Sequence, residues 1–195
     1  MNHTNNHHRR SIRLKGFDYA SPGAYFITLI TYRHACLFGE IRDGEMELST
    51  LGLIVKEEWM RSIEIRKEIR LEEDEFVIMP NHIHGIVWLV ERNNVADGIC
   101  PDIEGVKNVL PDFKGARRAP QQSAFHRSPR SLGSFIAGYK ASVTSRARKE
   151  LNIEGIWQRN YYEHILRNEK EHERIYAYIE SNPVHWAKDE ENIKK

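Results

Sequence analysis

The first part of the chain alternates between apolar and polar residues in the way that β-strands do. Residues 24–33, AYFITLITYR, are rich in aromatic and β-branched side chains and predict a strand. Residues 36–49 place Asp43 and Gly44 between two short strand-like runs, and this dipeptide favours the tight turn of a β-hairpin.

Two apolar runs in the middle of the chain predict a second pair of strands. They cover residues 71–79 and 82–90, and the link Met79-Pro80-Asn81 is short enough to make them antiparallel neighbours. The aromatic segment 156–167 predicts one more strand near the C-terminus.

Three other segments repeat their apolar residues every three to four positions, which predicts amphipathic helices. They begin near residues 50, 131 and 168, and Pro183 is expected to end the last one. Residues with good capping side chains stand at the start of two of them: Ser49, Thr50 and Asn168. The order strand, hairpin, helix, two strands, helix, strand, helix predicts an α+β fold, in which helices pack on one face of an antiparallel sheet.

Residues 91–130 break this pattern with Gly, Pro, Asn and charged residues, which predicts a long flexible insertion. Residues 1–195 are otherwise expected to form a single domain. No run approaches the roughly 18 apolar residues of a membrane span, and the N-terminus has no apolar segment typical of a secretory signal. Cys36 and Cys100 have no metal-type spacing and are too few for a disulfide scaffold, so a cytoplasmic protein is expected.

The net charge of +1 favours no class of partner, but the charges are unevenly distributed. Basic residues form groups at 9–15, 114–130 and 140–149, whereas acidic residues gather at 72–75 and 188–192. Charge segregated in this way allows a nucleic-acid-binding face on a nearly neutral protein. Ordinary solvated surfaces are the alternative.

Two histidines lie two positions apart in the apolar run FVIMPNHIHGIVWLV. Because strand side chains alternate between faces, His82 and His84 point to the same side. Burying two titratable rings costs free energy unless something binds them, and imidazole suits many divalent metals. The pair predicts a metal site that needs a third ligand; the alternative is two satisfied histidines that face solvent or a partner. Ligation requires neutral imidazole, so metal binding is expected to weaken below a pKa of about 6.5.

The last predicted helix offers both a third ligand and a nucleophile. One face of it carries, at helical spacing, Ile175, Tyr178, Ile179 and Asn182. Asn182 needs a polar partner on this inward face, and a metal or its water would serve. A metal beside Tyr178 predicts phosphoryl transfer with the phenolate as nucleophile; a core tyrosine followed by a capping asparagine is the alternative. Tyr139 is a rival nucleophile, but it lies in the centre of an apolar stripe and is assigned to the core.

Five blocks spread along the chain carry a family resemblance: RSIRLKGFDYASPGAYFITLIT, FVIMPNHIHGIVWL, LGSFIAGYKASVT, IWQRNYYEHILRNE and YIESNPVHW. Together they resemble the REP-associated tyrosine transposases, which belong to the single-tyrosine HUH transposases of the insertion-sequence-200 type. The resemblance runs from about Arg10 to Trp186 and excludes the insertion. The His-x-His strand alone is a weak signal, whereas five blocks in the same order are a strong one.

The resemblance implies a ferredoxin-like or RNA-recognition-motif-like sheet and a divalent ion, Mg²⁺ or Mn²⁺. It also implies cleavage and rejoining of single-stranded DNA, at hairpin (REP-like) sequences, through a 5′-phosphotyrosine that leaves a free 3′-OH. His82 and His84 match the metal-binding pair, and Tyr178 matches the nucleophile. Asn182 matches the third ligand, where many insertion-sequence relatives have Gln. Relatives include both monomers and homodimers.

The alternatives to this function are a catalytically inactive, domesticated nucleic-acid-binding module of the same fold and a metal-dependent hydrolase that uses water. DNA contacts are expected on the second helix, where phosphate-binding side chains share a face: Lys140, Thr144 and Arg148. Stacking on unpaired bases is expected from the aromatic segment 156–167, through Trp157, Tyr161 and Tyr162 with Arg159 alongside. Sheet packing is the alternative for these aromatic residues, and it is expected for at least one of Tyr161 and Tyr162. The basic N-terminal arm, with Arg10 and Arg13, is expected to enter a groove of a hairpin stem unless it is a disordered tail.

Overall fold

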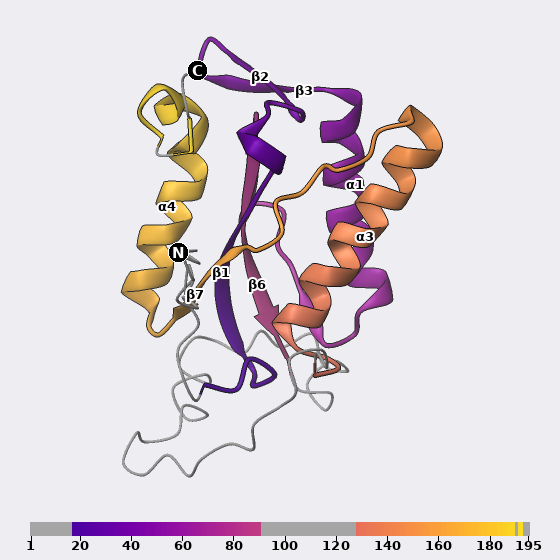
Figure 1. Cartoon of the computed structure of the whole chain (residues 1–195). Helices are drawn as coiled ribbons and strands as arrows, with labels where there is room; N and C mark the ends of the chain where they lie inside the picture. Colours follow the sequence, from indigo (N-terminus) through magenta and orange to yellow (C-terminus); the bar gives the residue numbers. More distant parts are fainter. Residues whose placement is uncertain (1–16, 91–127, 190, 193–195) are drawn as a thin grey trace, which may run out of the picture.

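A five-stranded antiparallel sheet forms the centre of the protein, which the computed structural model describes for residues 17–90, 128–189 and 191–192 (Figure 1). Its strands are β1 (Gly23–Ile30), β4 (Ile69–Arg70), β5 (Phe76–Met79), β6 (His82–Leu89) and β7 (Tyr162–Leu166). The order is β4-β6-β1-β7, and β5 pairs with β6 beside β4. The predicted Arg10 and Arg13 contacts lie outside the described residues, as does the predicted insertion up to residue 127.

Both turns that the sequence predicts between strands form in the structure. β5 and β6 pair directly across Pro80 and Asn81, because Met79 lies opposite His82. A separate hairpin joins β2 (Gly39–Arg42) to β3 (Glu45–Leu48). Its turn residues Asp43 and Gly44 have φ angles of 51° and 83°, the two positive values that a type I′ turn requires.

Two helices cover one face of the sheet. They are α1 (Thr50–Ile65), with Ser49 as its N-cap, and α3 (Leu132–Leu151), with Ser131 as its N-cap. Odd-numbered side chains of β1 and β6 point to this face and form the main core with both helices. The Tyr139 hydroxyl is buried there and donates to the Val55 carbonyl at 2.9 Å, as its core assignment predicts.

The third helix, α4 (Glu169–His185), lies on the opposite face (Figure 1). Its Ile175 and Ile179 pack on even-numbered residues of the sheet, which include Phe26 and Trp88. The prediction that all helices share one face is therefore wrong for α4. The path from β1 through α1, the strands β4 to β6, and α3 to β7 is a ferredoxin-like α+β unit, and α4 adds a third layer behind it.

Polar contacts attach α4 to the rest of the protein. The buried carboxylate of Glu75 accepts from the Trp88 indole at 2.6 Å and pairs with His172 of α4 at 2.5 Å. Asn168 caps the helix, as predicted, by accepting from the Glu171 amide.

Pro183 does not end α4, contrary to the prediction, because it lies inside the last turn, where it removes only one backbone hydrogen bond. The helix continues for two more residues, to His185. No helix in the described ranges combines the length and the hydropathy that crossing a membrane requires.

Candidate metal and tyrosine site

Both histidines of the His-x-His pair are buried on the even-numbered face of β6, beneath α4. His82 lies opposite Ile30 and His84 opposite Thr28 of β1. Their Nε2 atoms are 2.9 Å apart, so the two rings converge on one point. The strand geometry thus brings together the two side chains that the sequence pairs.

The hydrogen bonds of Asn81 fix which nitrogen of His82 carries the proton. The Asn81 amide nitrogen faces the carbonyls of His34 and Glu191, at 3.3 and 2.7 Å, so its oxygen must face His82 Nδ1, at 2.8 Å. His82 Nδ1 therefore donates, and the lone pair of Nε2 points at His84. The lone pair of a histidine ligand is oriented in this way by a hydrogen bond to its other nitrogen.

His84 is held in a way that suits a bound cation. Its Nδ1 lies 2.9 Å from the Thr28 hydroxyl, a group that can either donate or accept. When His84 Nδ1 donates to Thr28, the Nε2 lone pairs of both histidines face each other, and a cation between them relieves the repulsion. The residues present therefore fit a divalent metal on the strength of their own hydrogen bonds.

Burial keeps both rings neutral. It lowers the pKa of His82 to about 4, against the opposing effect of the Asp189 carboxylate. Burial, and then the proximity of His82, lowers the pKa of His84 well below its ordinary value. The rings of the folded protein thus take up protons only below their ordinary pKa of about 6.5, which moves the expected loss of metal binding to lower pH.

A carboxylate that the sequence did not single out joins the two histidines. His82, His84 and Asp189 each offer a ligand atom, and these atoms lie within 4.8 Å of one another. Asn182, which is 2% exposed, donates its amide to Asp189 at 3.2 Å, while its Oδ1 is buried and accepts no hydrogen bond in the described part of the chain. The predicted third ligand therefore lies at the site, with Asp189 directly beside the histidines.

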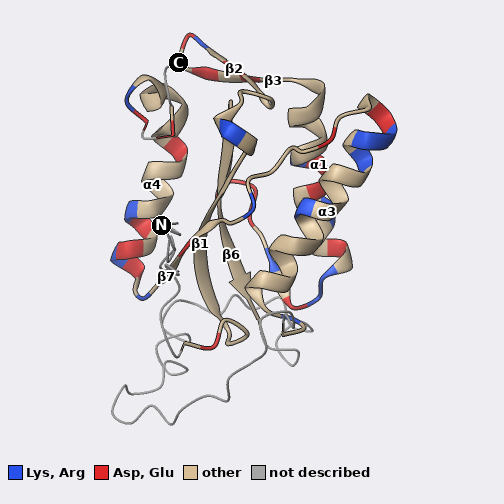
Figure 2. Cartoon of the chain, in the orientation of Figure 1, with Lys and Arg blue, Asp and Glu red and all other residues tan. Residues whose placement is uncertain are grey.

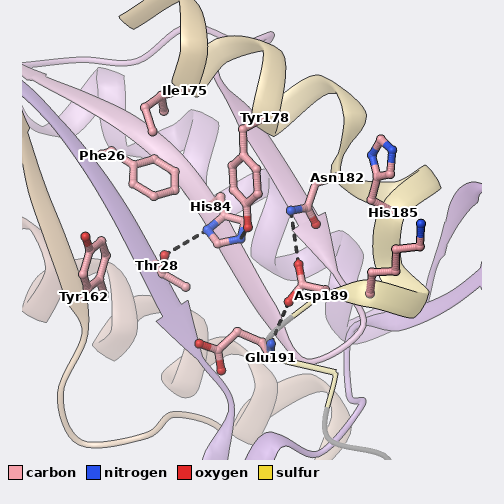
Figure 3. A pocket seen from close by; sticks show the side chains of 11 residues that line it. Phe26, Thr28, His84, Tyr162, Ile175, Tyr178, Asn182, His185, Asp189 and Glu191 are labelled. Atoms are coloured by element: carbon pink, nitrogen blue, oxygen red, sulfur yellow. Dashed lines mark hydrogen bonds between the residues drawn. The ribbon is translucent and has the colours of Figure 1, made fainter. Parts of the chain in front are cut away.

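Tyr178 projects from α4 to the same point (Figure 3). Its hydroxyl oxygen lies 3.2 Å from His84 Nε2, and the side chain is 41% exposed. Asn182 follows one turn later on the same helix, as the spacing predicts. The half-exposed Tyr178 thus lies where the buried histidines converge, and it lines a pocket of about 540 Å³ together with His84, His185 and Lys188.

The DNA contacts predicted on α3 lie on the other side of the sheet from this pocket (Figure 2). The Lys140 ammonium donates to the carbonyls of Gln158 and Asn160, at 2.9 and 3.0 Å. Thr144 bonds back to the Lys140 carbonyl, and the exposed Arg148 pairs with Glu154 at 2.7 Å. Lys140 and Thr144 are thus already bonded within the protein, and the structure does not bring this helix face to the site.

The aromatic residues predicted to stack on bases divide into two groups. Trp157 packs against Phe38 and Tyr139 in the main core, and Tyr161 packs against the same core. Arg159 is exposed, and Tyr162, at the start of β7, is 44% exposed and lines the pocket beside His84. Trp157 and Tyr161 therefore pack against the core, which is the alternative to stacking on bases.

Comparison with known proteins places the chain in a sequence family. The fold and the site define an α+β protein with a ferredoxin-like sheet, a His/His/Asp cluster of metal-binding type and an adjacent exposed tyrosine. The chain belongs to the family of an uncharacterized protein from Haemophilus influenzae, with which it is 44% identical over 184 residues, covering 94% of this chain and 93% of that protein. No protein-family model matches the chain.

A solved structure shares the fold. It is described as a REP-associated tyrosine transposase bound to a REP hairpin, and it superimposes with a TM-score of 0.53 at 19% identity. The similarity covers 87% of this chain and 72% of that chain. At this identity, the comparison establishes the ferredoxin-like fold.

Proposed function

We propose that the protein is a metal-dependent endonuclease and transposase of the REP-associated tyrosine type, a single domain that cuts and rejoins single-stranded DNA through Tyr178. The observation that carries the proposal is the 3.2 Å separation between the exposed Tyr178 oxygen and the imidazole of the buried His82–His84 pair. Tyr139, which has a structural role, is buried in the core, whereas Tyr178 is 41% exposed beside the histidines, and a nucleic-acid-binding module has no need of this juxtaposition. The five sequence blocks and the shared fold support the same class.

In this proposal His82, His84 and Asp189 hold a divalent ion, Mg²⁺ or Mn²⁺, and Asn182 orients the Asp189 carboxylate and offers its own free oxygen. Such an ion polarises a phosphate oxygen and fixes the phosphate that is to be cleaved. Thr28 and Asn81 hold the two imidazole rings in place, so that both ligands are ready before the ion arrives.

The reaction transfers a phosphoryl group from a sugar oxygen to Tyr178. The Tyr178 oxygen forms a bond to phosphorus while the bond from phosphorus to the 3′ oxygen breaks. The phenolic proton passes to solvent, and the departing 3′ oxygen takes up a proton, which leaves a 5′-phosphotyrosine and a free 3′-OH. Attack by a 3′-OH on the phosphotyrosine reverses these changes and rejoins the strand.

The partner in this proposal is single-stranded DNA that carries a hairpin, bound by a monomer or a homodimer. The protein of known structure with this fold is described as bound to a REP hairpin. Two exposed cations suit the phosphates that approach the pocket: Lys188 lines it, and Arg159 lies shortly before β7. On the other side of the sheet, Arg148 is an exposed contact for a DNA stem that extends beyond the pocket.

The test is incubation with end-labelled hairpin DNA that flanks the protein's own gene, in the presence of Mn²⁺ or Mg²⁺, followed by mass spectrometry of the DNA-linked peptide. We expect an adduct on Tyr178, which Tyr178→Phe abolishes without loss of DNA binding. Tyr176→Phe is the matched control, because Tyr176 lies on the same helix but bonds to Asp74 instead of facing the histidines. Cleavage without an adduct would instead identify a water-using hydrolase, and binding without cleavage would identify an inactive module.

A further inference from the structure

The pocket beside Tyr178 has a second, apolar half that the proposed phosphoryl chemistry does not use. One half carries the polar groups His84, Asn182 and Asp189. The other half is formed by Phe26, Tyr162 and Ile175, which come from β1, β7 and α4 (Figure 3). A volume of about 540 Å³ lies within the roughly 300–1,000 Å³ of pockets that hold small organic ligands, so the two halves have room for more than a phosphate.

Tyr162 is exposed in a way that its neighbour is not. It lies opposite Thr28 in the sheet and shares the even-numbered face with His84, whereas Tyr161 packs into the main core. Its nearest ring is Phe26, in an edge-on contact at 6.4 Å, and no ring of the described residues stacks on it. Its hydroxyl forms no hydrogen bond within the described ranges. Tyr162 therefore presents a half-exposed ring at the pocket, and no ring of the described residues stacks on it.

The position of Tyr162 relative to the nucleophile defines what the apolar half can hold. The rings of Tyr162 and Tyr178 both meet Phe26 edge-on, at 6.4 and 6.1 Å, so the two tyrosines are neighbours of the same phenylalanine. A phosphate that touches the Tyr178 oxygen is covalently attached to a nucleoside. That nucleoside is long enough to extend from Tyr178 into the apolar half of the pocket. The apolar half lines the same pocket as Tyr178 and offers a surface that can cover the flat face of its base.

We infer that Tyr162 is a substrate-binding residue, on which the unpaired nucleobase next to the scissile phosphate stacks, with Phe26 and Ile175 forming the rest of its site. This inference rests on the proposed function and adds to it a subsite for a single base. Stacking of this kind tolerates every base, because each base has a π-face. The subsite therefore selects unpaired over paired DNA at this position, because a paired base must first break its base pair, which costs free energy.

The experiment combines substitutions of Tyr162 with abasic DNA. The KM of cleavage and the Kd of binding are measured for hairpin DNA in which each single-stranded position in turn lacks its base. Removal of one stacked base contact weakens binding by roughly tenfold. We expect Tyr162→Ala to raise KM and Kd by that factor on intact DNA, and to have no effect on DNA that is abasic next to the scissile phosphate. Tyr162→Phe should restore tight binding, because only the ring is needed.

Tyr32→Ala is the matched control. Tyr32 is 54% exposed but does not line the pocket, so its loss should change neither constant. Thermal unfolding of each variant establishes that it is folded. The inference is overturned if Tyr162→Ala binds intact DNA as tightly as the wild type. It is also overturned if the factors by which Tyr162→Ala and base removal raise Kd multiply at every position. Two changes that remove the same contact are not independent, so at the stacked position their factors should not multiply.

Failure of this inference is distinguishable from failure of the proposed function. If the subsite is absent, Tyr162→Ala still forms the Tyr178 adduct with wild-type kinetics. If the protein does not cleave DNA, the Kd measurements with abasic DNA still report stacking on Tyr162, because they require no reaction.

Discussion

Acidification of the metal-free protein should destabilise it through the buried histidines. In the unfolded chain His82 takes up a proton near its ordinary pKa of 6.5, whereas in the folded protein burial lowers that pKa to about 4. Because the folded pKa is the lower one, the unfolded state binds more protons between these two values. The free energy of unfolding therefore falls as the pH drops from about 6.5 to 4.

The size of this effect follows from the width of that window. One pKa unit corresponds to about 1.4 kcal/mol, so His82 alone should contribute a loss of about 3 kcal/mol across the window. His84, whose pKa is lowered in the same direction, adds to it. A loss of this size is a large part of the roughly 5–15 kcal/mol that stabilises a typical protein.

The assay is urea unfolding at a series of pH values from 7.5 to about 4, with a chelator present, for the wild type and His82→Gln. Carboxylates that titrate in this range are common to both proteins, so the difference between the two curves isolates His82. We expect the wild type to lose about 3 kcal/mol more than the variant. Curves that stay parallel through this range would refute the reasoning. At pH 7, Mn²⁺ at about 100 times its Kd should stabilise the wild type alone, by about 2.7 kcal/mol.

Three further substitutions test the other face of the sheet, which α1 and α3 cover. Tyr139→Phe should leave cleavage intact and cost about 1 kcal/mol in urea unfolding, because the buried hydrogen bond from its hydroxyl to the Val55 carbonyl is lost; loss of the DNA adduct would overturn the core assignment. Gly85→Ala should destabilise the protein by about 1–3 kcal/mol, because the added Cβ would lie 2.8 Å from Trp59, and an unchanged melting temperature would contradict this packing. Lys140→Met should lower the melting temperature but leave the salt dependence of DNA binding unchanged, because its ammonium bonds to two carbonyls; a slope flatter by about 0.7 would instead indicate a phosphate contact.

Short-range signals in the sequence predict the local structure well. Ser49 and Asn168 cap helices because their side chains reach backbone amides three residues ahead, and Asp43-Gly44 tolerates the positive φ angles of its turn. His82 and His84 share a face because strand geometry leaves no alternative. These features depend on residues that are close in the chain, so the sequence is sufficient to identify them.

Features that depend on distant contacts were not predictable in this way. The isoleucines of α4 reveal that the helix has an apolar side, but not which face of the sheet that side covers. Asp189 lies in a charged run that is typical of a solvated tail, and only the fold of the chain after α4 brings it to His82. Trp157 and Tyr162 are both aromatic, and their neighbours in space alone decide that one is packed and the other exposed.

The histidine pair and Tyr178 belong to parts of the protein that should unfold independently of each other. His82 and His84 lie on β6, whose eight residues are all buried and which is paired on both sides by other strands. Tyr178 lies on α4, which rests on a small apolar cluster and a few polar contacts. Amide hydrogens of β6 should therefore exchange with solvent only when the whole protein unfolds, whereas those of α4 exchange through a smaller, less costly opening. The two histidines then stay in place while α4, with Tyr178, Asn182 and the Asp189 that follows it, detaches and returns.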